Sequence, residues 1–153
     1  MENDSKARHG SIVAQHPFHC VTPVQFRFSD FDMLGHLNNT RYFDLFDLAK
    51  DDYFTRVIDG ATEWSRPPMV IANINCDFLS QITPHEPVEA RTQVDHIGNK
   101  SFVLVQQLVN TETGELKCAC AVTMVFIDTA TGTPARVTPE WRAAISRLEQ
   151  REL

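Results

Sequence analysis

Residues 29–39, with the sequence SDFDMLGHLNN, concentrate acidic, amide and imidazole side chains in one short stretch. Asp32 and His36 lie four positions apart, which suits a carboxylate that acts as a general base with a histidine as its partner. If a helix begins directly after this stretch, its unpaired N–H groups stabilise negative charge that develops on a carbonyl oxygen. The stretch therefore predicts attack of activated water on a carbonyl carbon.

Two other interpretations of these residues have to be weighed. Asp, Asn and Gly are common between a strand and a helix because they cap helices and form turns. Asp30, Asp32 and Gly35 also match the first, third and sixth positions of a calcium-binding EF-hand loop. The calcium interpretation fails, because the fifth position is Leu34 and the twelfth is Arg41, where a bidentate Glu is required. Turn formation and chemistry both stay open on these residues alone.

A long helix is expected to follow. Between Thr40 and Ile58, apolar side chains recur at steps of three or four and form one stripe of about five turns: Tyr42, Phe46, Ala49, Tyr53 and Val57. The helix is expected to start at Asn39 or Thr40, whose side chains can accept a hydrogen bond from its first turn. Gly60 is its expected stop, and Ala61 to Pro68, with paired prolines, is expected to be a loop.

Strand-like segments make up most of the remaining chain, separated by residues that suit turns between antiparallel neighbours. The five predicted strands are Val24 to Phe28, Met69 to Ser80, Val88 to Ile97, Phe102 to Asn110 and Leu116 to Asp128. In the Val88 to Ile97 strand, alternation predicts a dry face that includes Val94 and a wet face that includes Gln93. A short helix, capped by Thr138 with Pro139 at its first position, follows. The dry face of such a sheet is expected to pack on the long helix.

The composition is that of one ordinary globular domain, with 153 residues, 42% hydrophobic and 22% charged. The formal charge of -6 and the absence of a Lys/Arg run argue against nucleic-acid binding. No apolar stretch approaches the roughly 20 residues of a membrane span, and nothing resembles a secretory signal. We expect a cytoplasmic protein with no nucleic-acid or membrane partner, built from a flexible arm (residues 1–18) and a single domain (residues 19–153).

The four cysteines are expected to be reduced thiols that pack as small apolar residues: Cys20, Cys76, Cys118 and Cys120. Cys118 and Cys120 are two residues apart on a predicted strand, so they share one face. Zinc sites usually need CxxC-like spacing and four ligands, so this CxC pattern predicts no metal site.

The pattern DxDxxGHxNNxxY, from Asp30 to Tyr42, resembles the signature loop of the hotdog-fold thioesterases of the 4-hydroxybenzoyl-CoA thioesterase-like group. The resemblance covers roughly residues 22–148 and includes IGNKSF at Ile97 to Phe102 and FIDTATGTPARVTPEWR at Phe126 to Arg142. GHxNN placed just before a long amphipathic helix is the specific part of the motif, since a DxD pair alone is common.

The resemblance implies an α+β hotdog fold, in which an antiparallel sheet of about five strands wraps around one long helix, with a short C-terminal helix besides. It also implies a homodimer with active sites at the subunit boundary, or a homotetramer. Asp32 corresponds to the catalytic carboxylate, as general base or nucleophile, and His36 to its partner. Related plant acyl-carrier-protein thioesterases have a catalytic Asn where this chain has Leu34, so their three-residue mechanism does not transfer.

The implied activity is hydrolysis of an acyl-CoA thioester to the free acid and CoA, without a cofactor, because coenzyme A is part of the substrate. The residues expected to bind substrate are Gly35, Asn38, Asn39, Lys100 and Ser101. Lys100 and Ser101 are candidates for the CoA phosphates, as are Arg91 and Arg136. Asn38 and Asn39 either cap the helix or orient the substrate, and Phe43 and Phe46 are candidates to line an acyl tunnel.

Two alternative functions fit the same resemblance. Hotdog enoyl-CoA hydratases and dehydratases also use an Asp and a His a few residues apart before the helix, although their motif usually continues HxD instead of HxNN. A non-catalytic acyl-CoA-binding module on the same fold would bind its ligand without turnover.

Overall fold

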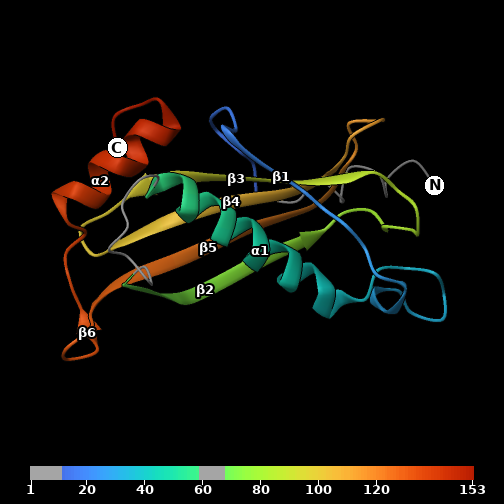
Figure 1. Ribbon diagram of the computed structural model, residues 1–153, viewed down its shortest axis with the longest axis horizontal. Coiled ribbons are helices and arrows are strands. Elements are labelled where there is room, and N and C mark those ends of the chain that lie inside the picture. Colours follow the sequence, from blue (N-terminus) through green and yellow to red (C-terminus); the bar gives the residue numbers. More distant parts are fainter. Residues whose placement is uncertain (1–11, 59–67) are drawn as a thin grey trace, which may run out of the picture.

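The computed structural model describes residues 12–58 and 68–153 (Figure 1). Three sequence predictions fall outside these segments, namely residues 1–11 of the predicted arm, the helix stop at Gly60, and the loop that begins at Ala61. The domain boundaries therefore stay a prediction.

An antiparallel sheet and one long helix make up most of the described chain. The strands are β1 (Cys20–Pro23), β2 (Met69–Phe78), β3 (Val88–Ile97), β4 (Ser101–Asn110), β5 (Leu116–Asp128) and β6 (Thr133–Pro134). The helices are the 3-10 turn η1 (Phe28–Asp30), α1 (Asn39–Val57) and α2 (Pro139–Glu149). The strand order is β1-β3-β4-β5-β2, and β6 pairs with β5 at its end. This arrangement confirms the expected hotdog fold class.

The helix α1 lies across one face of the sheet, as Figure 1 shows. It buries the expected stripe, Tyr42, Phe46, Ala49, Tyr53 and Val57, against the sheet. Gln106 of β4 is buried beneath the helix and donates from Nε2 to the carbonyl of Phe46 at 2.9 Å. Phe46 is therefore a core residue whose main chain ties the helix to the sheet, and its side chain lines none of the pockets described below.

The C-terminal end of α1, near Val57, packs against a cluster of aromatic rings. Phe54 of α1 contacts Phe102 of β4 and Trp141 of α2, with ring centroids 5.9 and 6.3 Å apart. Phe126 of β5 completes the cluster at 5.8 Å from Phe102 and 5.7 Å from Trp141. We call this the closed end of the helix, and the end at Asn39 the open end.

The prediction of a first strand from Val24 to Phe28 was wrong. The strand β1 ends at Pro23, which pairs with Glu89, and Phe28 begins the turn η1. Because β3 begins at Val88, the chain beyond Pro23 has almost no strand left to pair with. Val24 and Phe26 still pack against the core, which explains their alternation with polar residues.

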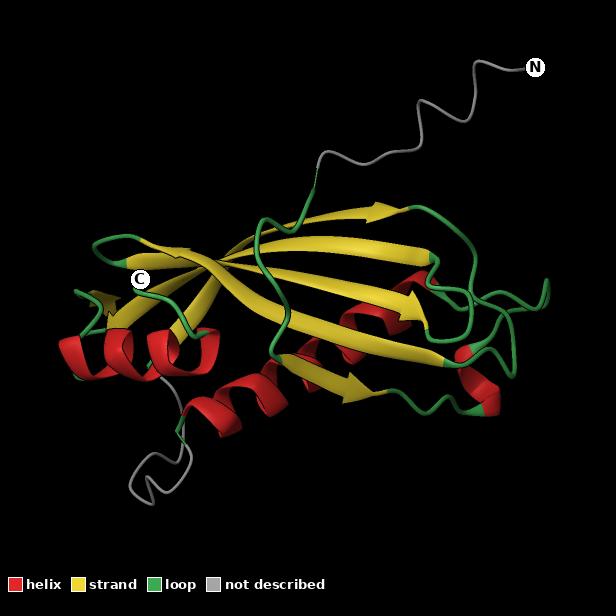
Figure 2. Cartoon of the chain, turned by 90° about the horizontal axis from the view of Figure 1, so that it is seen from above, coloured by secondary structure: helices red, strands yellow, loops and turns green. Residues whose placement is uncertain are grey.

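The face of the sheet opposite α1 is partly covered by the chain that leads into β1, as Figure 2 shows. Gln93 of β3 donates from Nε2 to the carbonyl of His16 at 2.8 Å, and the Gln93 side chain is fully buried. The prediction that Gln93 lies on a wet face was therefore wrong, because residues before β1 cover it. The predicted arm makes sheet contacts at Ile12 and His16.

The two edges of the sheet differ. At β1, Thr22 donates to Asp52 of α1 at 2.5 Å, and Arg56 donates to the Val21 carbonyl at 3.1 Å, so the helix covers this short edge. The ten-residue edge strand β2 has no strand partner on its outer side within the described chain. It instead exposes four large apolar side chains: Val70, Ile71, Ile74 and Phe78. A long exposed apolar edge is a typical surface for pairing with another chain.

Candidate active site

The Asp32 loop, residues 31–37, is a tight hairpin between η1 and α1. Phe31 and Leu37 form an isolated antiparallel bridge, and Asp32 N–H donates to the His36 carbonyl at 2.9 Å. The turn closes when Gly35 N–H donates to the Asp32 carbonyl at 3.0 Å, with Gly35 at φ +73°. Residues other than glycine rarely adopt this φ, so the role of Gly35 is to make the turn possible.

One oxygen of the exposed Asp32 carboxylate is held by this loop. Its Oδ1 accepts hydrogen bonds from the N–H groups of Leu34 at 2.9 Å and His36 at 3.1 Å. No described residue donates to Oδ2. The loop thus fixes the direction of the carboxylate and leaves one oxygen available to a water molecule or a substrate.

His36 meets Asp32 through its main chain. Both its N–H and its carbonyl contact Asp32, and within the described chain the imidazole makes no hydrogen bond to the carboxylate. The structure therefore brings together the two residues predicted to be catalytic, but by an amide contact in place of a contact between side chains.

Asp30, the first carboxylate of the DxD pair, anchors the loop. It is buried and accepts from the Arg27 N–H at 2.7 Å, and its Oδ1 faces the guanidinium groups of Arg27 at 3.1 Å and Arg41 at 3.5 Å. Burial raises its pKa, but the hydrogen bonds and charge of Arg27, with the charge of Arg41, outweigh burial and hold the pKa below its usual value. Asp30 is therefore an ionised structural group.

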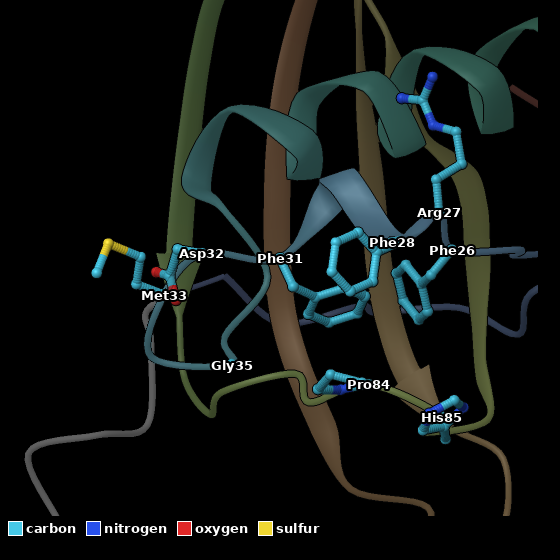
Figure 3. A pocket seen from close by; sticks show the side chains of 9 residues that line it. All are labelled: Phe26, Arg27, Phe28, Phe31, Asp32, Met33, Gly35, Pro84 and His85. Carbon is cyan, nitrogen blue, oxygen red and sulfur yellow. The ribbon is translucent and has the colours of Figure 1, made fainter.

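A largely apolar pocket of about 510 Å³ opens beside Asp32. Its lining is Phe26, Arg27, Phe28, Phe31, Asp32, Met33, Gly35, Pro84 and His85. Figure 3 shows Asp32 at one end of a row of three phenylalanine rings, with Pro84 and His85 across from them. Phe26 and Phe31 meet edge to face at 5.4 Å, and Phe28 is fully exposed. The pocket can accept an apolar group next to Asp32.

The Pro84–His85 wall is held by a charged network behind it. Glu86 accepts from Thr83 N–H at 2.9 Å and from Asn110 Nδ2 at 3.0 Å, and it pairs with the buried Lys117 at 2.5 Å. Burial raises the pKa of Glu86, but the contacts with Lys117, Thr83 and Asn110 outweigh it and lower the pKa to about 2. The network fixes the turn that carries His85, whose φ is +68°.

The start of α1 has a side-chain cap and, among the described residues, an unpaired N–H group, as expected of a helix N-terminus. It borders a second pocket and not the Asp32 pocket. Asn38 is the N-cap, and its Oδ1 accepts from Thr40 N–H at 3.2 Å. The N–H of Asn39 has no acceptor within the described chain. Asn39 lines a more polar pocket of about 520 Å³ together with Tyr42, Phe78, Leu79, Ser80 and Gln81. Asp32 and Asn39 therefore border different pockets of one chain.

Lys100 and Ser101 lie at the other end of the sheet. Ser101 pairs with Val125, near the start of β2 at Met69, whereas the open end of α1 contacts Phe78 through Tyr42 at 4.9 Å. These positions are separated by the length of β2, about 30 Å for a ten-residue strand. Within one chain, Lys100 and Ser101 are therefore not part of the Asp32 site.

The sequence prediction missed the pocket walls. Phe26 and Phe28 fall in the predicted Val24 to Phe28 strand, and Phe31 has no predicted role in the site. Three aromatic residues within six positions beside an acidic loop are a signal that could have indicated a binding surface. Pro84 and His85 had no sequence signal, because they come from a turn about fifty positions later in the chain. Of the further basic candidates, Arg91 is paired with Glu89 at 2.8 Å and Arg136 is exposed near the closed end.

Neither a metal site nor a membrane span is found within the described segments. No group of three or more His, Cys, Asp or Glu residues there is arranged to hold a metal ion. No helix in the described segments is both long enough and apolar enough to cross a bilayer.

Comparison with known proteins gives matches over most of the chain. The family described as the thioesterase-like superfamily matches residues 26–145. An uncharacterized protein, YsmA of Bacillus subtilis (strain 168), is 31% identical over 123 residues, which are 80% of this chain and 82% of YsmA.

Solved structures match as well. A thioesterase from Thermus thermophilus, complexed with coenzyme A and Zn, has a TM-score of 0.78 and 27% identity, with 89% of this chain and 98% of that chain covered. A DHNA-CoA thioesterase from Staphylococcus aureus shares the fold, with a TM-score of 0.71 and 21% identity, over 85% of this chain and 90% of that one.

Proposed function

We infer that this chain, which belongs to the thioesterase-like superfamily, hydrolyses an acyl-CoA thioester to a free acid and coenzyme A. The observation that carries the proposal is the Asp32 carboxylate, held by two loop amides at Oδ1 and open at Oδ2, beside a pocket lined by three phenylalanines. The bound coenzyme A of the Thermus thermophilus thioesterase supports CoA as the leaving thiol.

In the proposed reaction, Asp32 acts through Oδ2. As a general base, it takes a proton from water while the water oxygen attacks the thioester carbonyl carbon; as a nucleophile, it attacks that carbon itself. In both cases the bond from carbon to sulfur breaks and CoA leaves. On the general-base route, the proton taken by Asp32 passes to the departing sulfur. On the nucleophilic route, water then hydrolyses the anhydride between the acyl group and Asp32, which releases the acid and restores the carboxylate. The row of Phe26, Phe28 and Phe31 would hold the apolar acyl group next to the carboxylate.

His36 supports this chemistry mainly through its N–H, which orients Asp32. We therefore expect His36→Ala, which keeps that amide, to lower kcat/KM by about tenfold or less, well below the effect of removing the carboxylate. A loss from His36→Ala as large as that from Asp32→Ala would assign the chemistry to the imidazole as well.

The open N–H of Asn39 is the proposed oxyanion donor. It lies at the helix N-terminus, where the backbone dipoles add positive charge that stabilises a developing oxyanion. Because Asn39 borders a different pocket from Asp32, we propose that the complete site forms where a second subunit covers the open end. The exposed Phe28, Met33 and Leu34 on the Asp32 side support such cover.

The edge strand β2 is the proposed seam of this homodimer. If two β2 strands pair antiparallel about a two-fold axis, the Phe78 end of one chain lies beside the Met69 end of the other. The second subunit then brings its Lys100 and Ser101 from its closed end toward Asp32 of the first, where they could bind CoA phosphates. Association of two such dimers would give the homotetramer.

The first experiment is a free-thiol assay of the wild-type protein over a panel of aliphatic and aromatic acyl-CoAs, with an acyl carrier protein thioester beside them. We expect thiol release with at least one acyl-CoA. Hydration of an enoyl-CoA without thiol release would instead identify a hydratase. Tight binding across the panel without turnover would identify a binding module. We propose no resident cofactor, so extensive dialysis against EDTA should leave thiol release unchanged.

A subunit-mixing experiment tests the shared site. Asp32→Asn and Lys100→Glu proteins are unfolded together and refolded, so that about half of the dimers are mixed if pairing is random. Each mixed dimer then holds one site with both wild-type residues, and at low substrate the mixture should recover about a quarter of wild-type activity. Activity equal to the mean of the two parent variants would contradict a site shared between subunits.

A further inference from the structure

Three of the four cysteines form a cluster that the proposed hydrolysis does not use. Cys76 of β2 lies directly opposite Cys120 of β5 in the antiparallel ladder, and their Sγ atoms are 2.8 Å apart. Cys118 is on the same face of β5, two residues from Cys120 and opposite Phe78. All three thiols are free, and the fourth, Cys20, lies apart on β1.

The backbone already suits a bond between Cys76 and Cys120. Residues directly opposite on antiparallel strands have Cα atoms about 4.5–5.5 Å apart, which lies within the range of about 4.4–6.8 Å found across disulfides. The two sulfur atoms need only side-chain rotation to approach from 2.8 Å to a bond of about 2.05 Å. No strand has to move.

The three thiols are unequally exposed. Cys118 and Cys120 are 0% and 1% exposed, whereas Cys76 is half-buried on the outer strand of the sheet. Cys20 is fully buried beside Thr22 and Asp52. In a single subunit, Cys76 is therefore the thiol that a small oxidant reaches first.

The charges around the cluster favour a thiolate at Cys76. Hydrogen bonds from Cys118 and Cys120 lower the pKa of Cys76; burial opposes this shift, and the nearby Lys50 ammonium adds to it. Lys50 is a largely buried residue of α1 whose ammonium pairs with Asp47 at 2.8 Å. The hydrogen bond with Cys76 and burial raise the pKa values of Cys118 and Cys120. Asp77 adds to the rise at Cys118 and Asp47 to that at Cys120, where Lys50 opposes it. These shifts make Cys76 the most readily ionised thiol of the cluster, and a thiolate is the form that reacts with an oxidant.

We propose that Cys76 and Cys120 are a peroxide-reactive thiol pair that closes reversibly into a cross-strand disulfide. The Cys76 thiolate attacks one oxygen of hydrogen peroxide, the bond between the oxygens breaks, hydroxide leaves, and Cys76 becomes a sulfenic acid. Cys120 sulfur then attacks Cys76 sulfur, the bond from sulfur to oxygen breaks, and the hydroxyl leaves as water with the Cys120 proton. In sum, two thiols and one peroxide give one disulfide and two waters, with two electrons passing from sulfur to oxygen.

Neither cysteine lines the Asp32 pocket, but Cys76 lies on β2, the proposed homodimer seam, so the modification acts at the seam and not on the Asp32 carboxylate. It would tie the exposed edge strand β2 covalently to its neighbour β5, across 44 positions of the chain. The cysteine cluster therefore has a chemistry beyond its packing role.

The test treats the folded, fully reduced chain with hydrogen peroxide, blocks the remaining thiols after denaturation, and maps the disulfide by peptide mass spectrometry. We expect the free thiols to fall from four to two, a loss of two hydrogen atoms without intermolecular crosslinks, and recovery with dithiothreitol. The bridge should map to Cys76 and Cys120.

Two variants test whether the disulfide forms between Cys76 and Cys120. Cys20→Ser should still lose two thiols, now from three to one, whereas Cys76→Ser should form no intramolecular bridge. Four thiols surviving in the wild-type protein would overturn the proposal. So would a bridge from Cys76 to Cys118, or oxidation of Cys76 to a sulfinic acid without any bridge.

Discussion

The two ends of α1 differ in the interactions that hold them and in how far their apolar side chains are buried. At the closed end, rings from α1, β4, β5 and α2 pack edge to face and are buried, among them Phe102 and Trp141. At the open end, the Asp32 loop is held by main-chain hydrogen bonds and carries the exposed Met33, and Phe28 of the adjacent η1 is also exposed. The difference indicates that burial at one end supplies stability, while the other end keeps its apolar groups available for a ligand or a second subunit.

The largest expected effect on stability comes from removing a phenylalanine ring at the closed end. Removing a phenylalanine ring at the open end is the comparison. Phe102→Ala removes a ring that is 1% exposed and should lower the free energy of unfolding by about 3–5 kcal/mol. Phe28→Ala removes a fully exposed ring and should change it by about 0.5 kcal/mol or less. Urea unfolding followed by tryptophan fluorescence measures both.

The same pair of variants should behave in the opposite way in the thiol-release assay. Phe28→Ala is expected to weaken substrate binding, because Phe28 lines the Asp32 pocket. A large stability loss from Phe28→Ala, with unchanged activity, would show that the open end is an ordinary part of the core and would break the comparison.

A smaller effect, dependent on pH, is expected from Glu86, which holds the pocket wall at the open end. Its pKa is lowered to about 2 from its ordinary value of 4.5, so its pairing with Lys117 stabilises the fold above pH 4.5 and is lost as the pH falls toward 2. The contribution at neutral pH is up to about 3 kcal/mol at 1.36 kcal/mol per unit.

Glu86→Gln tests this window directly. The difference in unfolding free energy between wild type and variant should be largest near pH 7 and should approach zero near pH 2. Because other carboxylates also titrate there, the difference between the two proteins is the quantity to follow. A difference that stays constant from pH 7 to pH 2 would rule out the ionised pair as its source.

The smallest expected effect compares the two helix caps. Asn38→Ala and Thr138→Ala each remove a side chain that accepts a hydrogen bond from the first turn of its helix, and each should cost about 1 kcal/mol of stability. Only Asn38→Ala should also lower kcat/KM, because it disturbs the helix start that carries Asn39. Equal activity of the two variants would separate the start of α1 from the reaction.

Much of the fold could be predicted because its signals are local. The strands Val88–Ile97 and Leu116–Asp128 and the cap at Thr138 were confirmed at their predicted bounds, since alternation and capping depend on neighbouring residues. The position of β1 could not be predicted, because it depends on where β3 begins, and this partner lies some seventy positions away in the chain. The two-residue strand β6 is too short to produce a periodic signal.

The position of the Asp32 loop could be predicted from the sequence, whereas the catalytic and binding roles of its residues stay a prediction. The spacing of Asp32, Gly35 and His36 indicated a functional loop, and the structure places that loop at an exposed pocket. The hydrogen bonds from the loop N–H groups to Asp32 could not be predicted from residue types. They depend on a hairpin that requires the positive φ of Gly35. The distance between Lys100 and Asp32 follows from the strand pairing of the sheet, which a short sequence motif does not determine.

The most direct test of the account compares Asp32→Asn with Asp128→Asn. Both aspartates are exposed and accept an N–H two residues further along the chain, but Asp128 is the last residue of β5 and does not line the Asp32 pocket. With the best acyl-CoA of the panel, Asp32→Asn should lower kcat by about 10²–10⁴-fold, with acyl-CoA affinity and melting temperature nearly unchanged. Asp128→Asn should leave kcat at the wild-type value. Thiol release that survives Asp32→Asn at the wild-type rate would contradict the central role of this carboxylate.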